Sequence, residues 1–114
     1  MREFDLEKRT TEFAKGVIQL CKVLSRDSIN DRLIDQVVGA SGSVGANYRE
    51  ANDPLGKNDF LQRMRISRRE AKESLHWLEL ILEANMEKES QIKILLKEAD
   101  ELKRILSAII DKSQ

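Results

Sequence analysis

The chain contains 114 residues, of which 20 are basic and 20 acidic, so its formal net charge is zero. A chain of this length fits one domain, and a zero net charge provides no overall field that would attract nucleic acid or an anionic membrane. One proline, five glycines and 4% aromatic residues favour a helical bundle over a sandwich or barrel, whose many turns need glycine and proline.

Apolar residues recur at intervals of three and four from about residue 5 to residue 24, which predicts a first amphipathic helix. Its predicted core face consists of Leu6, Thr10, Phe13, Val17, Leu20, Cys21 and Leu24. Cys21 is the only cysteine, so no disulfide can form within the chain, and we expect a buried, unreactive thiol in a cytoplasmic protein. The N-terminal stretch is too charged for a secretory signal, and no apolar run is long enough to span a membrane.

A second helix is predicted over residues 31–50, with Ser28 or Asn30 as its N-cap. Its core face consists of Leu33, Ile34, Val37, Ser41, Val44, Tyr48 and Ala51. Gly39, Gly42 and Gly45 lie inside this helix, and each costs up to about 1 kcal/mol relative to alanine. The alternative is a helix that breaks near Gly42. On the side away from the core, another helix could approach closely at a small-residue groove that consists of Gly39, Ser43 and Ala46.

After turn-forming residues around Pro54, a third helix is predicted over residues 58–84, capped by Asn58 or Asp59. Its core face consists of Phe60, Leu61, Met64, Ala71, Leu75, Leu78 and Leu82. Two further sets of residues lie on other sides of this helix. The basic stripe consists of Arg65, Arg68, Arg69 and Lys72, and the apolar strip consists of Ile66, Trp77 and Leu80.

A fourth helix is predicted over residues 90–111, with Asn85 as a left-handed residue after the third helix and Ser90 as the next N-cap. Its core face consists of Ile92, Leu95, Leu96, Ala99, Leu102, Leu106 and Ile109. Four helices joined by short loops predict an all-α fold, in which residues 1–114 form a single antiparallel up-down-up-down four-helix bundle.

The basic stripe is the strongest candidate for a binding site, because its side chains recur every three or four residues and could follow a phosphate backbone. The alternative is that these charges are solvated, or that they pair with Glu73 or with the acidic fourth helix of a neighbouring subunit. No aromatic residue interleaves the stripe to stack on bases.

The apolar strip predicts an oligomer interface, because a tryptophan and a leucine exposed beside an isoleucine would form a sticky patch on a monomer. The alternative is a broad bundle core that takes up Trp77. If the small-residue groove of one copy meets the apolar strip of the next head to tail, the assembly can close into a ring.

Residue types needed for catalysis or metal binding are scarce. His76 is the only histidine, and we expect it on the surface rather than beside a nucleophile. Glu73 and His76 have the spacing of one ligand pair of a di-metal bundle site, but no second histidine exists to complete it. We therefore expect no enzyme activity, no metal and no cofactor.

Three stretches of the sequence carry a family pattern. They read Gly39-Ala40-Ser41-Gly42-Ser43-Val44-Gly45-Ala46-Asn47-Tyr48-Arg49-Glu50-Ala51, then Lys57-x-Asp59-Phe60, then Glu70-Ala71-x-Glu73-Ser74-x-x-Trp77-Leu78-Glu79-Leu80. Together they resemble the bacterial four-helix-bundle family of 23S rRNA intervening-sequence proteins, which includes the accessory variability proteins of diversity-generating retroelements. The resemblance spans nearly the whole chain.

This resemblance implies a four-helix protomer assembled into a homopentameric ring, and it marks Asn47, Arg49 and Glu50 as family positions with a structural role. It also implies RNA or reverse transcriptase partners, although the zero net charge departs from the basic surfaces of the retroelement relatives. We therefore expect a non-enzymatic homo-oligomeric scaffold that binds RNA, a ribonucleoprotein or a reverse transcriptase through the basic stripe. The alternative is a protein-binding assembly module with no nucleic-acid role.

Overall fold

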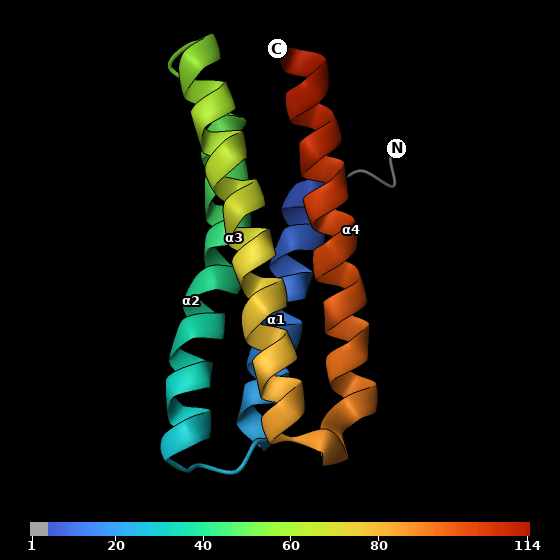
Figure 1. Cartoon of the computed structure of the whole chain (residues 1–114). Helices are drawn as coiled ribbons and strands as arrows, with labels where there is room; N and C mark the ends of the chain where they lie inside the picture. Colours follow the sequence, from blue (N-terminus) through green and yellow to red (C-terminus); the bar gives the residue numbers. More distant parts are fainter. Residues whose placement is uncertain (1–4) are drawn as a thin grey trace.

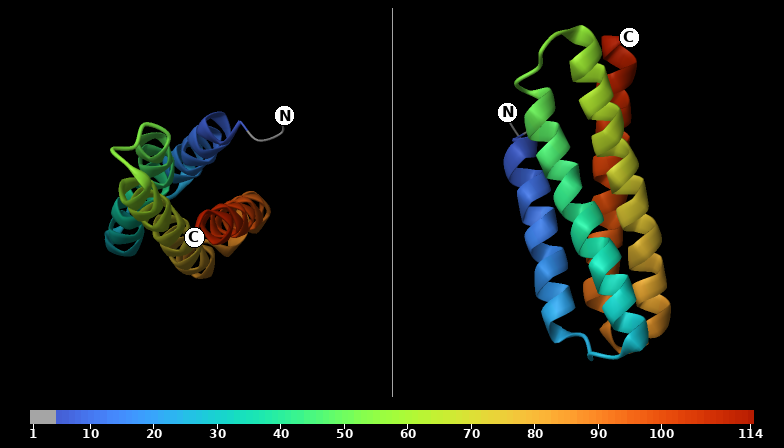
Figure 2. Two further views of the ribbon diagram at one scale, coloured as in Figure 1. Left: turned by 90° about the horizontal axis from the view of Figure 1, so that it is seen from above. Right: turned by 90° about the vertical axis from the view of Figure 1, so that its left-hand side faces the viewer.

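A computed structural model describes residues 5–114 of the chain, and these residues form four long α-helices and one short 3-10 helix. The elements are α1 (Leu6–Val23), α2 (Ser28–Ala51), α3 (Lys57–Ala84), η2 (Met86–Lys88) and α4 (Glu89–Ser113). In Figure 1 the chain descends through α1, rises through α2, descends through α3 and rises through α4. Seen from above in Figure 2, α3 lies between α2 and α4, with α1 beside α2. The all-helical bundle expected from the sequence is confirmed.

The core faces predicted from periodicity largely match the buried side chains. All seven residues predicted for the first helix are buried, including Cys21. On α4 the predicted Ile109 is only half-buried, and Ile110 is buried in its place. The prediction for α3 missed three buried residues, which are Ser67, Ser74 and Ile81. The two serines escape a search for apolar residues because each is small and satisfies its own hydroxyl, as Ser67 Oγ does by donating to the Val44 carbonyl at 2.7 Å.

The predicted cap of the second helix is wrong. Asp27 caps α2, because its side chain accepts a bond from the Asn30 N–H at 2.7 Å, and the helix therefore begins at Ser28 rather than at residue 31. Asn30 has a different role, because it is buried between helices. Asp27, Ser28 and Asn30 are all residues that favour an N-cap, so sequence preference alone does not select among them.

The capping residues predicted for the third and fourth helices are also wrong, although the third helix ends at Ala84 as predicted. Gly56 precedes α3 with a φ of 143°, which suits glycine, and the Asp59 carboxylate accepts from the Leu55 N–H at 3.0 Å instead of capping the helix. Asn85 has a negative φ and is therefore not left-handed, with φ −144° and ψ 57°. Ser90 lies inside α4, whose first turn has no side-chain cap.

The helix α2 continues without interruption through its three interior glycines, so the alternative of a break near Gly42 is wrong. Gly45 is buried against α1, and a Cβ atom placed on it would lie 2.9 Å from Thr10 Oγ1. Thr10 cannot easily move, because it is buried and its hydroxyl donates to the Leu6 carbonyl at 2.7 Å. Gly39 and Gly42 would meet no atom within 4 Å. Of the three interior glycines of α2, only Gly45 is therefore explained by the close approach of another helix of the bundle.

This difference predicts opposite effects of two alanine substitutions. Gly42→Ala should raise the free energy of unfolding by up to about 1 kcal/mol, because alanine is the better helix former and the new methyl group meets nothing. Gly45→Ala should lower it by about 1–2 kcal/mol, because overpacking against Thr10 outweighs that gain. Urea denaturation of the two variants measures both effects, and equal stabilisation by both would contradict the packing described for Gly45.

A buried pair of asparagines joins the start of α2 to the end of α3. Asn30 Nδ2 donates to Asn85 Oδ1 at 3.1 Å, and Asn85 Nδ2 donates to Asn30 Oδ1 at 2.9 Å. The same amide groups also donate to the Ser25 and Ile81 carbonyls, at 2.7 Å and 2.9 Å. Both side chains are 2% exposed, so this small network satisfies groups that would otherwise be costly to bury.

Replacement of the first asparagine should therefore lower the free energy of unfolding more than the subsequent replacement of the second. Asn85→Ala leaves the Asn30 amide without its partner and should lower the free energy of unfolding by about 1–3 kcal/mol. The double variant Asn30→Ala/Asn85→Ala should lose less than the sum of the two single losses, whereas Asn58→Ala on the surface should stay within about 0.5 kcal/mol of the parent. Strict additivity in this cycle would contradict the pairing.

Candidate nucleic-acid interface

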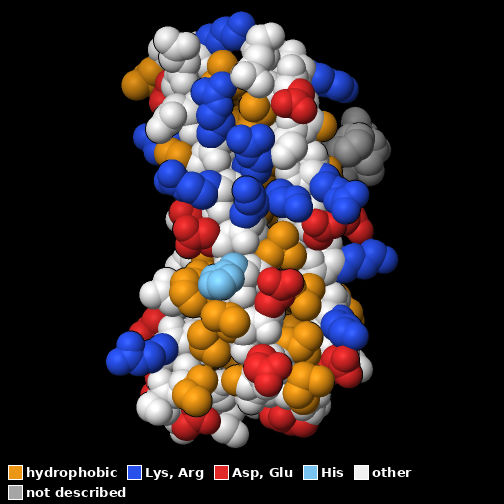
Figure 3. Space-filling model, in the orientation of Figure 1, with side chains coloured by type: hydrophobic (Ala, Val, Ile, Leu, Met, Phe, Trp, Pro, Cys, Tyr) orange, Lys and Arg blue, Asp and Glu red, His pale blue; other side chains and the backbone are white. Residues whose placement is uncertain are grey.

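The outer face of α3 carries the basic stripe. Arg65, Arg69 and Lys72 are exposed and Arg68 is half-buried. All four line a shallow, open hollow of about 700 Å³, whose other walls are also α3 side chains. Figure 3 shows Lys and Arg side chains gathered on the upper half of this face. The structure thus brings the four predicted residues together on one accessible surface.

The cations of the basic stripe have no carboxylate ion-pair partner in the described part of the chain. Among residues 5–114, none of the four takes part in an ion pair, and the one side-chain bond they make is from Arg65 Nη2 to the neutral Gln114 Oε1 at 3.3 Å. The interpretation that they pair with Glu73 inside the protomer is therefore wrong. Burial raises the pKa of the adjacent Glu70, and the Glu73 charge adds to that rise, while Arg69 opposes it.

The apolar strip is partly taken up by the bundle. Trp77 and Ile66 are half-buried, and Trp77 packs against the core, whereas Leu80 remains 40% exposed. The Trp77 Nε1 atom is buried without a hydrogen-bond partner among the described residues. Its ring meets His76 edge-on, with ring centroids 4.8 Å apart. The alternative, a broad bundle core that takes up Trp77, therefore explains the partial burial of its ring. It does not provide a hydrogen-bond acceptor for the Trp77 Nε1–H group.

The small-residue groove lies on α2, and its middle residue, Ser43, is near the contact with α3. Gly39 and Ala46 are exposed and Ser43 is half-buried. The bond from Ser67 to the Val44 carbonyl shows which turns of α2 and α3 meet, and the preceding residues, Ser43 and Ile66, lie at the outer edge of that contact. Further along the contact between α2 and α3, Trp77 lines a hollow with α2 residues that include Leu33 and Gln36. Ser43 therefore lies beside the apolar strip, whereas Gly39 and Ala46 are open to solvent on α2.

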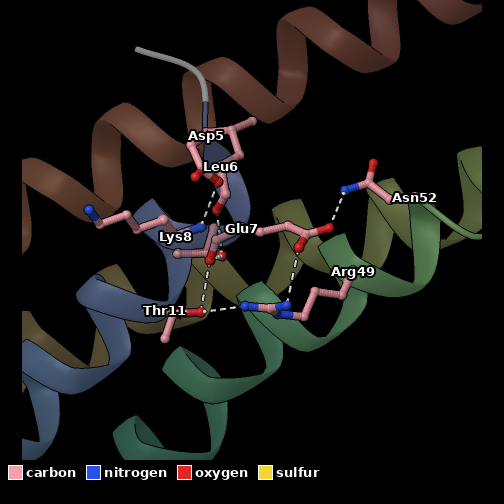
Figure 4. Close-up of polar contacts among 8 residues, drawn as sticks. Asp5, Leu6, Glu7, Lys8, Thr11, Arg49 and Asn52 are labelled. Atoms are coloured by element: carbon pink, nitrogen blue, oxygen red, sulfur yellow. Dashed lines mark hydrogen bonds and ion pairs between the residues drawn. The ribbon is translucent and has the colours of Figure 1, made fainter. Parts of the chain in front are cut away.

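Two of the three family positions tie α2 to its neighbours. Arg49 donates to Glu7 Oε1 at 3.1 Å and to Thr11 Oγ1 at 3.2 Å, and both partners lie on α1 (Figure 4). Asn47 donates to the Ser43 carbonyl at 2.9 Å and accepts from Arg63 Nη1 of α3 at 3.5 Å. Glu50 is exposed at the end of the helix.

Sequence reasoning singled out the cations of α3 and missed the residues that continue their line. His76, Glu79 and Glu83 are exposed and follow Lys72 at intervals of four, three and four residues. The same spacing that revealed the basic stripe could have revealed them, because they share its side of the helix. The outer face of α3 is therefore basic in its first half and acidic in its second.

Three further observations concern metal binding, membrane-spanning helices and the reactivity of Cys21. Across residues 5–114, no group of three or more His, Cys, Asp or Glu side chains is placed to hold a metal ion. In the same part of the chain, no helix combines the length and apolar character of a membrane span. Burial raises the pKa of the Cys21 thiol to about 11, so it stays protonated and unreactive at neutral pH.

Comparison with known proteins identifies the family. The family model described as 23S rRNA-intervening sequence protein matches residues 2–108. A solved structure from Bacteroides thetaiotaomicron, described as a protein of unknown function from the S23 ribosomal protein family, is similar with a TM-score of 0.79 and 28% identity, over 91% of this chain and 96% of that chain. The search of curated proteins found no match. The resemblance carried by the motif between Gly39 and Ala51 is thus confirmed, and the chain belongs to the family of 23S rRNA-intervening sequence proteins.

Proposed function

We propose that this protein is a non-enzymatic, homo-oligomeric scaffold that binds RNA, free or within a ribonucleoprotein, through the basic stripe. The observation that carries this proposal is the set of four cationic side chains on one accessible face, none of them in an ion pair among residues 5–114. A phosphate backbone supplies the missing anions and releases counterions when it binds.

The basic stripe favours contact with the phosphate backbone of RNA over contact with its bases. From Arg65 to Lys72 the helix rises about 10 Å, a length over which an extended strand presents several phosphates. The hollow has one aromatic edge, formed by His76 and Trp77, and Trp77 is half-buried. Because little ring surface is free to stack on bases, we expect binding with weak sequence preference.

Assembly is the second part of the proposal. The exposed Leu80 of the apolar strip and the exposed Gly39 and Ala46 of the small-residue groove supply helix-docking surfaces on the antiparallel four-helix protomer. A homopentameric ring is the arrangement that the family resemblance favours. Five basic stripes in one assembly would bind one RNA strand with avidity, because each bound stripe raises the local concentration of the next.

RNA affinity should depend steeply on salt and on the stripe. Neutralising four phosphates of a single strand gives a slope of about −3 for log K against log salt concentration per protomer. The variant Arg65→Glu/Arg68→Glu/Arg69→Glu/Lys72→Glu should lose at least about 100-fold in affinity, because it loses those contacts and adds repulsion. Fluorescence anisotropy with a labelled single-stranded RNA, titrated at several salt concentrations, measures both.

A matched control separates a local site from net charge. Reversal of four exposed cations elsewhere, Lys8, Lys15, Lys22 and Lys97, to glutamate changes the net charge by the same amount. The control should keep most of the affinity, because those side chains lie outside the hollow lined by the stripe. Equal losses in both variants, or a response to salt that is nearly flat in the parent, would contradict the site.

The oligomer has a separate test. The pure protein should sediment at several times the protomer mass of 13.1 kDa. Leu80→Glu should reduce that mass, because it places a charge in the apolar strip, while the control Ile94→Glu on α4, where Ile94 is 70% exposed, should not. A monomeric mass for the parent protein, or equal effects of the two substitutions on the mass, would contradict the proposed interface.

A purely protein-binding assembly module is the second candidate, and the exposed Leu80 beside the half-buried Ile66 and Trp77 favours it. In that case a partner helix occupies the seam between α2 and α3, and the basic stripe is solvated. A complex captured from cell extract that survives nuclease treatment and is lost in Leu80→Glu supports this module, and a complex that nuclease dissolves supports the RNA scaffold.

A further inference from the structure

Six exposed residues follow one another along the outer face of α3 at intervals of four, three, four, three and four residues. They are Arg65, Arg69, Lys72, His76, Glu79 and Glu83. These intervals average 3.6 residues, the number of residues per turn of an α-helix, so the side chains form one line along α3 that a second helix can follow. Figure 3 shows the Lys and Arg side chains above the single histidine and acidic side chains below it. We call this set the α3 charge line, and His76 divides it into a basic and an acidic half.

The order of charges is unfavourable for an isolated helix. Neighbouring members of the same half, such as Arg65 and Arg69 or Glu79 and Glu83, are four residues apart and repel each other. The helix dipole disfavours an acid in the last turn, where α3 carries Glu83 and no base. No charged member of the line forms an ion pair among residues 5–114.

A second copy of this chain supplies the missing charges in the right order. If two α3 helices lie antiparallel, with a two-fold axis beside His76, Lys72 meets Glu79 of the second copy, and Arg69 meets Glu83. Symmetry repeats each pair, because a two-fold interface is self-complementary. The antiparallel arrangement also opposes the two helix dipoles. We infer that the α3 charge line is a surface for self-association, in which two protomers pair antiparallel around His76.

The pairing has a consequence for the proposed RNA site, and this consequence, unlike the pairing itself, rests on the proposed function. Arg69 and Lys72 belong both to the basic stripe and to the charge line. A paired protomer therefore presents its cations to another protein copy instead of to phosphate. RNA and the second copy compete for one face, so self-association regulates access to the stripe.

A charge-swap experiment tests the pairing without RNA. The variant Arg69→Glu/Lys72→Glu makes most of the line acidic, and the variant Glu79→Lys/Glu83→Lys makes it wholly basic apart from His76. Each variant alone should associate through α3 at least about tenfold more weakly than the parent, because like charges face each other. An equal mixture should recover association, because each acidic line then faces a basic one. Association is measured by energy transfer between labelled copies of the nuclease-treated protein at low salt.

Cysteine cross-linking tests the geometry and ignores any other interface. In the inferred pair, two copies of residue 76 lie beside the axis, whereas two copies of residue 65 are about 33 Å apart, being 11 residues from the centre at about 1.5 Å each. His76→Cys should therefore form a disulfide-linked dimer under mild oxidation, and Arg65→Cys should not. The parent protein, whose only thiol is the buried Cys21, is the background control. In a head-to-tail ring, the same residue of two neighbours does not meet, so a link at residue 76 reports the two-fold pair.

Both results are required. Recovery of association in the mixture together with a cross-link at residue 76 alone supports the pairing. Failure of the mixture to recover, or linking at residue 65 as efficient as at residue 76, overturns it. Because RNA is absent from both experiments, such a failure leaves the RNA site standing, and a failure of RNA binding leaves the pairing standing. Circular dichroism confirms that each variant is folded, as expected for changes at exposed positions.

Discussion

The packing of α3 between α2 and α4 determines which of its side chains reach solvent, and the rest of the structure depends on it. One side of the helix is committed to the core through buried residues such as Met64, Ala71 and Leu78. The bond from Ser67 to the Val44 carbonyl fixes the register against α2. With that side fixed, the opposite side must carry the residues that cannot be buried, and these are the charged members of the α3 charge line.

The arginines among residues 5–114 include two contrasting classes. Arg9 bridges α1 and α4 by donating to Glu98 and Glu101, both at 2.6 Å, and these bonds raise its pKa further above the already high value of a guanidinium. Arg49 similarly joins α2 to α1. The arginines of the basic stripe have no carboxylate partner among residues 5–114. The net charge of zero is a sum over both classes, so it does not predict the charge of any one surface.

Periodicity predicted the parts of the fold that depend on one helix at a time. The core faces of α1 and α4 followed from apolar spacing, because each helix buries a single stripe. Features that depend on a neighbouring helix were not predictable in this way. Gly45 is needed because Thr10 approaches it, and Asn30 is buried because Asn85 lies opposite. The basic stripe was visible in the sequence, but its accessibility and lack of partners required the three-dimensional arrangement.

Acetylation of lysines in the presence and absence of RNA tests most directly whether the basic stripe is the RNA-binding surface. Lys72 lies in the hollow on α3, and Lys22 on α1 is an exposed internal control. The reaction rate of each lysine is read by mass spectrometry from one sample. Binding at the stripe predicts that saturating RNA slows acetylation of Lys72 several-fold and leaves Lys22 unchanged. Equal rates at Lys72 with and without bound RNA would contradict the proposed site.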